Sequence, residues 1–100
     1  MAKLTTVYWR DIPAQVIAKE RRDTAKIVLT ERFAEAIDKA AMRAKMAGTD
    51  AYLEQWRREV VNCSRDLQAA ADEAAGKLEA EFDDETLKAY VKTGGNAPDS

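Results

Sequence analysis

The first third of the chain alternates between apolar and polar side chains with the two-residue period of β-strands. Three such runs lie at residues 4–11, 14–19 and 24–29, separated by Asp11-Ile12-Pro13 and by the polar cluster Glu20-Arg21-Arg22-Asp23. Proline cannot donate a hydrogen bond to a neighbouring strand, so a turn or a strand edge is expected at the first break. Because short connections join antiparallel strands, the pattern predicts a three-stranded antiparallel meander.

Two longer stretches carry apolar residues at helical spacing. The first helix is expected to begin after Thr30, whose hydroxyl suits an N-cap, and to end before Gly48. The second is expected to begin after Ser64 or Asp66, and a short amphipathic helix is expected after Asp84. The residues predicted to form the core are Trp9, Ile27, Phe33, Ile37, Leu67, Leu78 and Phe82.

Residues 49–64 are compatible with two structures. The spacing of Tyr52, Trp56 and Val60 fits one continuous helix, whereas the β-branched pair Val60-Val61 favours a strand. We favour a short helical turn at 50–55 followed by a fourth strand at 56–62. The expected fold class is therefore α+β, a small antiparallel sheet with two main helices packed on one face. Residues 1–92 are expected to form this single domain, and residues 93–100, rich in turn formers, a disordered C-terminal tail.

The composition indicates a cytoplasmic protein that neither spans a membrane nor binds nucleic acid. No apolar run approaches the roughly 20 residues of a membrane span, the start has no apolar leader, and the one cysteine, Cys63, suits a reducing compartment. Basic residues outnumber acidic ones by 13 to 9 through Arg65, and acidic outnumber basic by 9 to 3 afterwards. The pI of about 5.2 disfavours nucleic acid. We expect the oppositely charged halves to attract each other mainly within one fold.

The residues that usually perform catalysis are scarce in this chain. It has no histidine, which is the commonest general base and metal ligand. Its four glycines do not form a phosphate-binding loop, and one cysteine with scattered carboxylates does not form a zinc site. We therefore expect no catalytic residue, no metal, no cofactor and no enzymatic activity.

Two short segments are the best candidates for a binding site. Tyr8-Trp9-Arg10 and Trp56-Arg57-Arg58 each place a guanidinium beside an indole. If the fourth strand pairs with the first, the side chains would form one patch for an anion or for a partner's carboxylates. The candidate residues are Tyr8, Arg10, Trp56, Arg57 and Arg58. The alternative is that the tryptophans lie in the core and the arginines are simply solvated.

Three strings of sequence resemble a small bacterial domain family labelled virulence factor. They are Val7-Tyr-Trp-Arg-Asp-Ile-Pro-Ala-Gln-Val-Ile-Ala18, Phe33-Ala-Glu-Ala-Ile-Asp-Lys-Ala-Ala-Met42 and Tyr52-Leu-Glu-Gln-Trp-Arg-Arg58. The resemblance covers roughly residues 3–82. It implies either a stand-alone protein of about this length or a domain appended to a larger helical-repeat virulence factor. It supplies no catalytic residues, and it implies association with one-carbon, folate and corrinoid methyl-transfer proteins.

These observations lead to one leading interpretation and two alternatives. The leading one is a non-enzymatic accessory or regulatory module that binds a protein partner of unknown identity. The first alternative is a small-molecule or anion-binding accessory subunit of a one-carbon methyl-transfer system, with Arg10 and Arg57 presented to a folate-like carboxylate. The second is a homodimer formed through an exposed strand edge.

Overall fold

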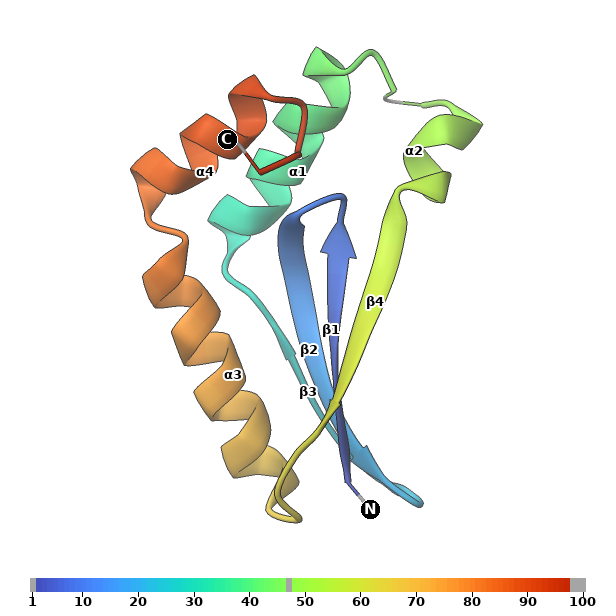
Figure 1. Cartoon of the computed structure of the whole chain (residues 1–100), viewed down its shortest axis with the longest axis vertical. Coiled ribbons are helices and arrows are strands. Elements are labelled where there is room, and N and C mark those ends of the chain that lie inside the picture. The colour runs from blue at the N-terminus through green and yellow to red at the C-terminus, as the bar shows by residue number, and fades with distance from the viewer. Residues whose placement is uncertain (1, 47, 98–100) are drawn as a thin grey trace.

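The structure is a computed structural model that describes residues 2–46 and 48–97. Over these residues the chain forms, in order, β1 (Lys3–Trp9), β2 (Ile12–Glu20), β3 (Asp23–Val28), α1 (Glu31–Arg43), α2 (Asp50–Glu54), β4 (Trp56–Asn62), α3 (Leu67–Glu81) and α4 (Asp84–Lys92). The strands form one antiparallel sheet in the order β3-β2-β1-β4 (Figure 1). The predicted α+β class, the N-terminal meander and the fourth strand are confirmed.

The ambiguous stretch before α3 contains a short helix and a strand, as we favoured, rather than one continuous helix. α2 is a five-residue helix, and β4 follows it after Gln55. β4 pairs with β1 over its whole length, from Lys3 opposite Asn62 to Trp9 opposite Trp56, without a shift in register. The β-branched residues of this segment thus outweigh its helical spacing, because pairing with β1 supplies the hydrogen bonds that an isolated strand lacks.

The helices cover most of one face of the sheet, and the other face is open except around Val7 and Trp9, where α1 and α2 approach it. α3 packs across β2 and β3, while α1 packs against β2 and α4 (Figure 1). Side chains alternate between the faces of a strand. Val16 and Ile27, which lie opposite each other, therefore face α3, and both belong to the core or pack against it. Their neighbours Ile17 and Val28 point to the uncovered side.

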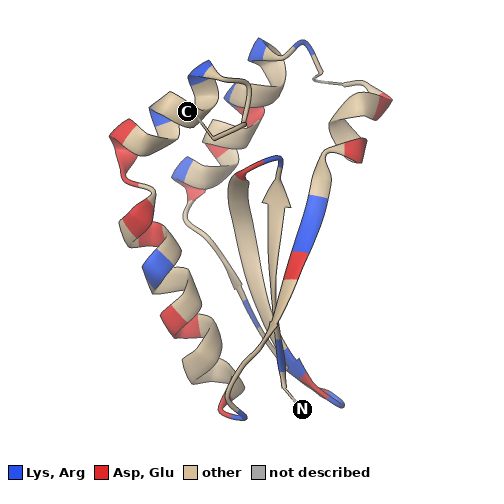
Figure 2. Ribbon diagram, viewed as in Figure 1, with Lys and Arg blue, Asp and Glu red and all other residues tan. Residues whose placement is uncertain are grey.

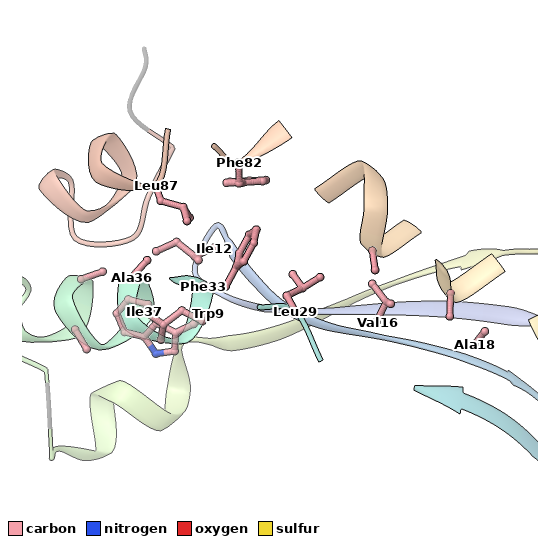
Figure 3. Close-up of a cluster of buried hydrophobic side chains, with 14 residues drawn as sticks. Trp9, Ile12, Val16, Ala18, Leu29, Phe33, Ala36, Ile37, Phe82 and Leu87 are labelled. Atoms are coloured by element: carbon pink, nitrogen blue, oxygen red, sulfur yellow. The ribbon is translucent and has the colours of Figure 1, made fainter. Parts of the chain in front are cut away.

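The main core lies between the helices and the sheet (Figure 3). Of the predicted core residues, Trp9, Phe33, Ile37 and Phe82 are buried. The other three, Ile27, Leu67 and Leu78, are partly buried and pack against this cluster. The rings of Phe33 and Phe82 meet edge to face with their centroids 6.0 Å apart, which joins the start of α1 to the end of α3.

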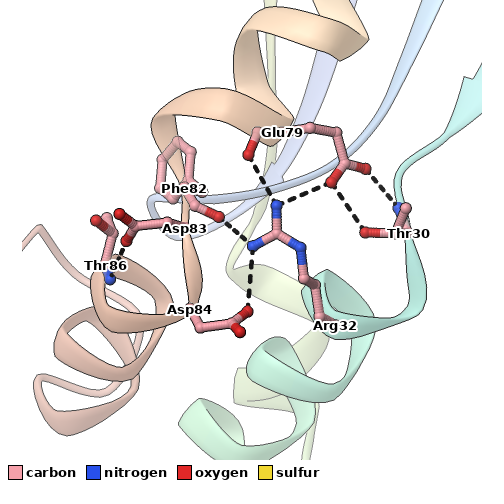
Figure 4. A network of polar contacts seen from close by, with 7 residues as sticks. All are labelled: Thr30, Arg32, Glu79, Phe82, Asp83, Asp84 and Thr86. Carbon is pink, nitrogen blue, oxygen red and sulfur yellow. Dashed lines mark hydrogen bonds and ion pairs between the residues drawn. The ribbon is translucent and has the colours of Figure 1, made fainter.

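A polar brace also joins α1 to α3 (Figure 4). The Thr30 side chain does not cap α1 as expected; its N–H and hydroxyl instead donate to the Glu79 carboxylate at 2.8 and 2.9 Å. Arg32 donates to the same carboxylate at 2.9 Å and to the backbone oxygen of Phe82 at the end of α3. Burial raises the pKa of Glu79, but these hydrogen bonds and the Arg32 charge outweigh it and lower the pKa overall.

The starts of α3 and α4 are capped by aspartates. Asp66, one of the two candidates, accepts from the Ala69 N–H at 3.2 Å and caps α3. α4 is capped by Asp83 rather than by Asp84, because the Asp83 carboxylate accepts from the Thr86 N–H at 2.8 Å. Both aspartates are ordinary N-caps. The expected cap of α4, Asp84, is one position too late.

The segment after α4 differs from the predicted disordered tail as far as the structure describes it. Residues 93–97 form a turn in which Gly94 and Gly95 are buried. The Asp11 N–H donates to Gly95 O at 2.9 Å, and the Ala97 N–H donates to the Asp11 carboxylate at 2.7 Å. This close packing of the turn requires glycine at position 95, because a Cβ there would lie 2.6 Å from Cζ3 of Trp9. The rest of the predicted tail, residues 98–100, lies outside the described residues.

Candidate functional site

The pairing of β1 with β4 brings the two candidate segments together. Tyr8 lies opposite Arg57, and Trp9 lies opposite Trp56, as the expected pairing of the first and fourth strands requires. Successive side chains on a strand point to opposite faces, however. Tyr8 and Arg57 therefore lie on the face that the helices cover, and Trp56 and Arg58 on the open one. The side chains of the two strands consequently do not form a single patch.

Arg57 is held by neighbouring groups on the covered side of β4. Its guanidinium lies 4.4 Å from the centroid of the Tyr8 ring and 3.0 Å from an oxygen of Asp11. It also donates to the backbone oxygen of Arg10 at 2.7 Å and to the Glu59 carboxylate. Burial lowers the pKa of Arg57, but hydrogen bonds to Glu59 and Asp11 outweigh it and raise the pKa. Arg57 is thus a fixed cation whose charge is already matched within the chain.

Arg10 has its contacts inside the fold. It occupies the β1–β2 turn with a positive φ of 54°. Its guanidinium donates to Gln55 Oε1 at 3.2 Å, to Gly94 O at 3.0 Å and to the sulfur of Met46 at 3.2 Å. The same group lies 5.4 Å from the centroid of the Trp9 ring. These contacts hold the turn, the start of β4 and the C-terminal turn together, so Arg10 has a structural role.

Arg58 and Trp56 lie beside two adjoining hollows of the open face. Arg58 is exposed and makes no hydrogen bond or ion pair with any residue that the structure describes. A hollow of about 330 Å³ is lined by Val7, Gln15, Trp56, Arg57 and Arg58. A second hollow of about 250 Å³ shares Val7, Gln15 and Trp56 with the first and extends to Asp38 on α1. An unpaired guanidinium beside an apolar recess can bind a carboxylate and an adjoining apolar group.

The register defines which side chains point to the open face. Trp9, opposite Trp56, is on the same side but is fully buried beside Tyr52 of α2, so it is left out of the set. We call this set the open sheet face: Lys3, Thr5, Val7, Gln15, Ile17, Lys19, Thr24, Lys26, Val28, Trp56, Arg58, Val60 and Asn62. Four of these described strand residues are basic and none is acidic. Lys3 and Lys19 even lie directly opposite each other, an arrangement of like charges that destabilises a sheet. The open sheet face is therefore a cationic surface.

The carboxylates lie mainly on the helical side of the molecule. Figure 2 shows acidic residues along α3 and at the start of α4, and basic residues on β2, β3 and β4. The open sheet face also carries apolar groups, since Val28 and Val60 are 66% and 56% exposed. A surface that combines exposed apolar side chains with charge of one sign is typical of an interaction site.

Sequence reasoning named two of the residues on the open sheet face and missed its lysines. Trp56 and Arg58 were candidates, whereas Lys3, Lys19 and Lys26 were not. A signal for them does exist in the sequence. Alternate residues of a strand lie on the same face of the sheet, and on one of the two faces the strands carry no acidic residue. Which residues of different strands share that face follows only from the register.

The described residues include no group of three or more histidine, cysteine, aspartate or glutamate side chains that could hold a metal ion. Within residues 2–46 and 48–97, no helix is both long enough and apolar enough to cross a bilayer. Cys63 is a half-buried free thiol at the end of β4, and it packs against the core.

Comparison with known protein families gives a match over most of the chain. The profile of the family described as "Virulence factor" matches residues 7–91, which include all the strands except the start of β1 and nearly all of the helical layer. A search of curated proteins gave no match, and a search of solved structures gave none either. Because the match spans well over half of the chain, this protein belongs to the virulence factor family.

Proposed function

We propose that this protein is a non-enzymatic accessory module that binds an acidic segment of a partner protein on its open sheet face. The observation that carries the proposal is the charge of this face, where the strands contribute four basic side chains and no acidic one. The scarcity of catalytic residue types supports a binding role over a catalytic one.

The groups on this face suit a partner segment that has both carboxylates and apolar side chains. Arg58 is unpaired and can bind a carboxylate through two parallel hydrogen bonds. Lys3 and Lys19 repel each other in the free protein, and a carboxylate between them would remove that repulsion. Val28 and Val60 offer exposed apolar surface on either side of the sheet's centre. The partner segment is therefore expected to be amphipathic and acidic.

The proposal includes a cytoplasmic location, because a free cysteine and no disulfide suit a reducing compartment. It also includes a protein rather than a nucleic acid as the partner. The four basic groups lie among valine and isoleucine side chains, and the aromatic residue Trp56 is at the margin of the face rather than at its centre. Nucleic-acid-binding sheets instead place stacking aromatics on central strands.

Cross-linked co-purification from native lysate tests this proposal. Arg58→Glu and Lys26→Glu should each reduce recovery of the partner, since they reverse charge on the open sheet face. Lys88→Glu makes the same change of charge on α4, which packs on α1, and should leave recovery unchanged. Recovery should fall as salt rises and should survive nuclease treatment. Recovery of the bait alone, or equal loss in all three variants, would contradict the proposal.

A second candidate function is suggested by the two adjoining hollows. A small carboxylate, for instance a folate-like one, could pair with Arg58 while its ring system lies against Trp56. Arg10 and Arg57, expected to serve this purpose, both have guanidinium contacts within the chain. Thermal-shift measurements distinguish the two functions. Stabilisation by folates without any protein partner, lost in Arg58→Ala, supports this candidate, and no shift with any of them rejects it.

A further inference from the structure

The outer edge of β4 has a row of backbone groups that pair with no other strand in the described part of the chain. The Cys63 N–H donates to Ala2 O at 3.1 Å, and the Arg10 N–H donates to Gln55 O at 3.0 Å. In an antiparallel pair, residues alternate between pointing their N–H and C=O groups toward the partner strand and away from it. The odd-numbered residues of β4 therefore bond to β1. Trp56, Arg58, Val60 and Asn62 direct their backbone groups outward.

Little protects this edge against pairing with another strand. Proteins usually protect an edge with proline, lysine, a bulge or a covering element. β4 contains no proline and no lysine, and it runs for seven residues in register with β1. In Figure 1 it lies on the side of the molecule opposite α3 and α4. Its charged residues lie in the first half, whereas Val60 and Val61 in the second half are 56% and 57% exposed.

We propose that two copies of the chain associate by antiparallel pairing of β4 with β4 about a two-fold axis at Val60. Such pairing joins the two four-stranded sheets into one continuous sheet. In this register Val60 lies opposite its own copy. The flanking pairs are Arg58 with Asn62 and Glu59 with Val61. No pair within β4 combines like charges, and Val60, which is 56% exposed in the single chain, packs against its own copy.

The charge pattern of the strand selects this register over its neighbours. An axis at Arg58 or at Glu59 places that residue opposite its own copy, so that like charges meet at the centre. An axis at Val61 brings Arg57 opposite Arg65. An axis at Val60 avoids all three conflicts. Because each copy uses the same patch of surface, the association closes at two copies.

Dimerisation of this kind does not rest on the proposed function, because its argument uses the backbone edge and register of β4, although Arg58 and Val60 belong to both surfaces. It has a consequence for that function, however. A two-fold axis perpendicular to the sheet leaves both open sheet faces on the same side. The dimer would then present two cationic faces side by side, which suits a partner with two acidic segments.

Sedimentation velocity on the full chain tests the proposal. Over a dilution series from about 1 mM to 1 μM, the mass should change from that of two copies toward 11.1 kDa. Val60→Lys places two like charges at the axis and should weaken association at least about tenfold. Val28→Lys is the matched control, because Val28 is an exposed valine on the open face of the opposite edge strand. It should leave association unchanged.

Cross-linking tests the register and does not depend on how Val60→Lys behaves. In a Cys63→Ser background, Val60→Cys should cross-link efficiently with a short bifunctional maleimide, because residues that face each other in such a pair have Cα atoms about 5.5 Å apart. Val28→Cys in the same background should not. Three results would overturn the proposal. They are a monomer mass at every concentration, association lost with Val28→Lys but kept with Val60→Lys, and a dimer mass without cross-linking at position 60.

Discussion

Replacing Gly95 by alanine tests the contact that fixes the C-terminal turn against the start of the sheet. Gly95 has a φ of 99°, a region that L-residues with a side chain rarely adopt. A Cβ at this position would lie 2.6 Å from Cζ3 and 3.0 Å from Cε3 of Trp9. Trp9 has no exposed surface, so its ring has no room to move away. Either the turn must leave the ring or the core must rearrange.

The structure allows the cost to be divided into two parts. Placing a non-glycine residue at a sparsely populated positive φ costs about 1–3 kcal/mol. Forcing an extra methyl group into a packed core costs about 1–3 kcal/mol more. Gly95→Ala should therefore lower the free energy of unfolding by about 2–6 kcal/mol, a large part of the roughly 5–15 kcal/mol of a typical domain.

Two other glycines provide matched controls that separate these parts. Gly48 has a φ of 75°, and a Cβ there meets nothing within 4 Å. Gly48→Ala thus has the conformational cost without the clash, partly offset by about 0.4–1 kcal/mol from the stiffer unfolded chain, for a net loss near 1 kcal/mol. Gly76 is helical and also has space around it, so Gly76→Ala should stabilise the protein by up to about 1 kcal/mol.

Urea unfolding followed by tryptophan fluorescence measures all three variants. Trp9 is buried and Trp56 is half-buried, so unfolding exposes both indoles. The expected order of stability is Gly76→Ala, wild type, Gly48→Ala and Gly95→Ala. If Gly95→Ala and Gly48→Ala agree to within about 0.5 kcal/mol, the clash with Trp9 is absent, and the packing of the C-terminal turn described above is wrong.

Two further predictions concern side chains with contrasting surroundings. Glu79→Gln should cost about 1–2 kcal/mol at neutral pH, because the hydrogen bonds from Thr30 and Arg32 would then end on a neutral amide instead of a carboxylate. The cost stays this small because the Arg32 and Glu79 side chains are 30% and 27% exposed, so that water screens their attraction. The pKa of Glu79 is lowered in the folded state, so the stability that its carboxylate contributes is complete above the ordinary pKa of 4.5. This stability is lost as the pH falls through the folded-state pKa. Urea titrations of wild type and variant should therefore converge at low pH. Arg10→Ala should lower stability by about 2 kcal/mol, whereas Arg58→Ala should change it by less than about 0.5 kcal/mol, as thermal melts can check; equal losses would contradict the internal contacts assigned to Arg10.

The sequence predicted the elements of this fold because their signals are local. Alternation along β1 to β3 and the apolar stripe of α1 each lie within one element, and so does the β-branched pair of β4. The C-terminal turn was not predicted, because glycine pairs are typical of flexible tails. Gly94 and Gly95 instead serve close contacts with Arg10 and Trp9, far away in the sequence. A contact of this kind becomes visible only after the helices have placed the end of the chain.

The candidate site could be predicted in part for a related reason. The pairing of the first and fourth strands predicts that Tyr8 and Arg57 are neighbours, and they lie opposite each other in the structure. The division of Arg57 and Arg58 between two faces also follows from strand alternation, once 56–62 is accepted as a strand. The sequence did not reveal that the guanidinium of Arg10 donates its hydrogen bonds to groups within the chain. That depends on a left-handed turn and on the distant residues Gln55 and Gly94.

The division of charge along the chain becomes a division between two sides of the molecule. All four described strands lie in the basic part, and α3 and α4 lie in the acidic part, so the open sheet face is cationic while the carboxylates lie mainly on the helical side (Figure 2). Pairs such as Arg32 with Glu79 neutralise only some of these groups. If charge drove self-association, the helical side of one copy would dock on the sheet of the next, and the assembly would remain open-ended. Pairing of β4 with β4 closes at two copies and relies on backbone hydrogen bonds and valine burial. Salt therefore separates the two: screening should dissolve a charge-driven assembly and leave the β4 dimer largely intact.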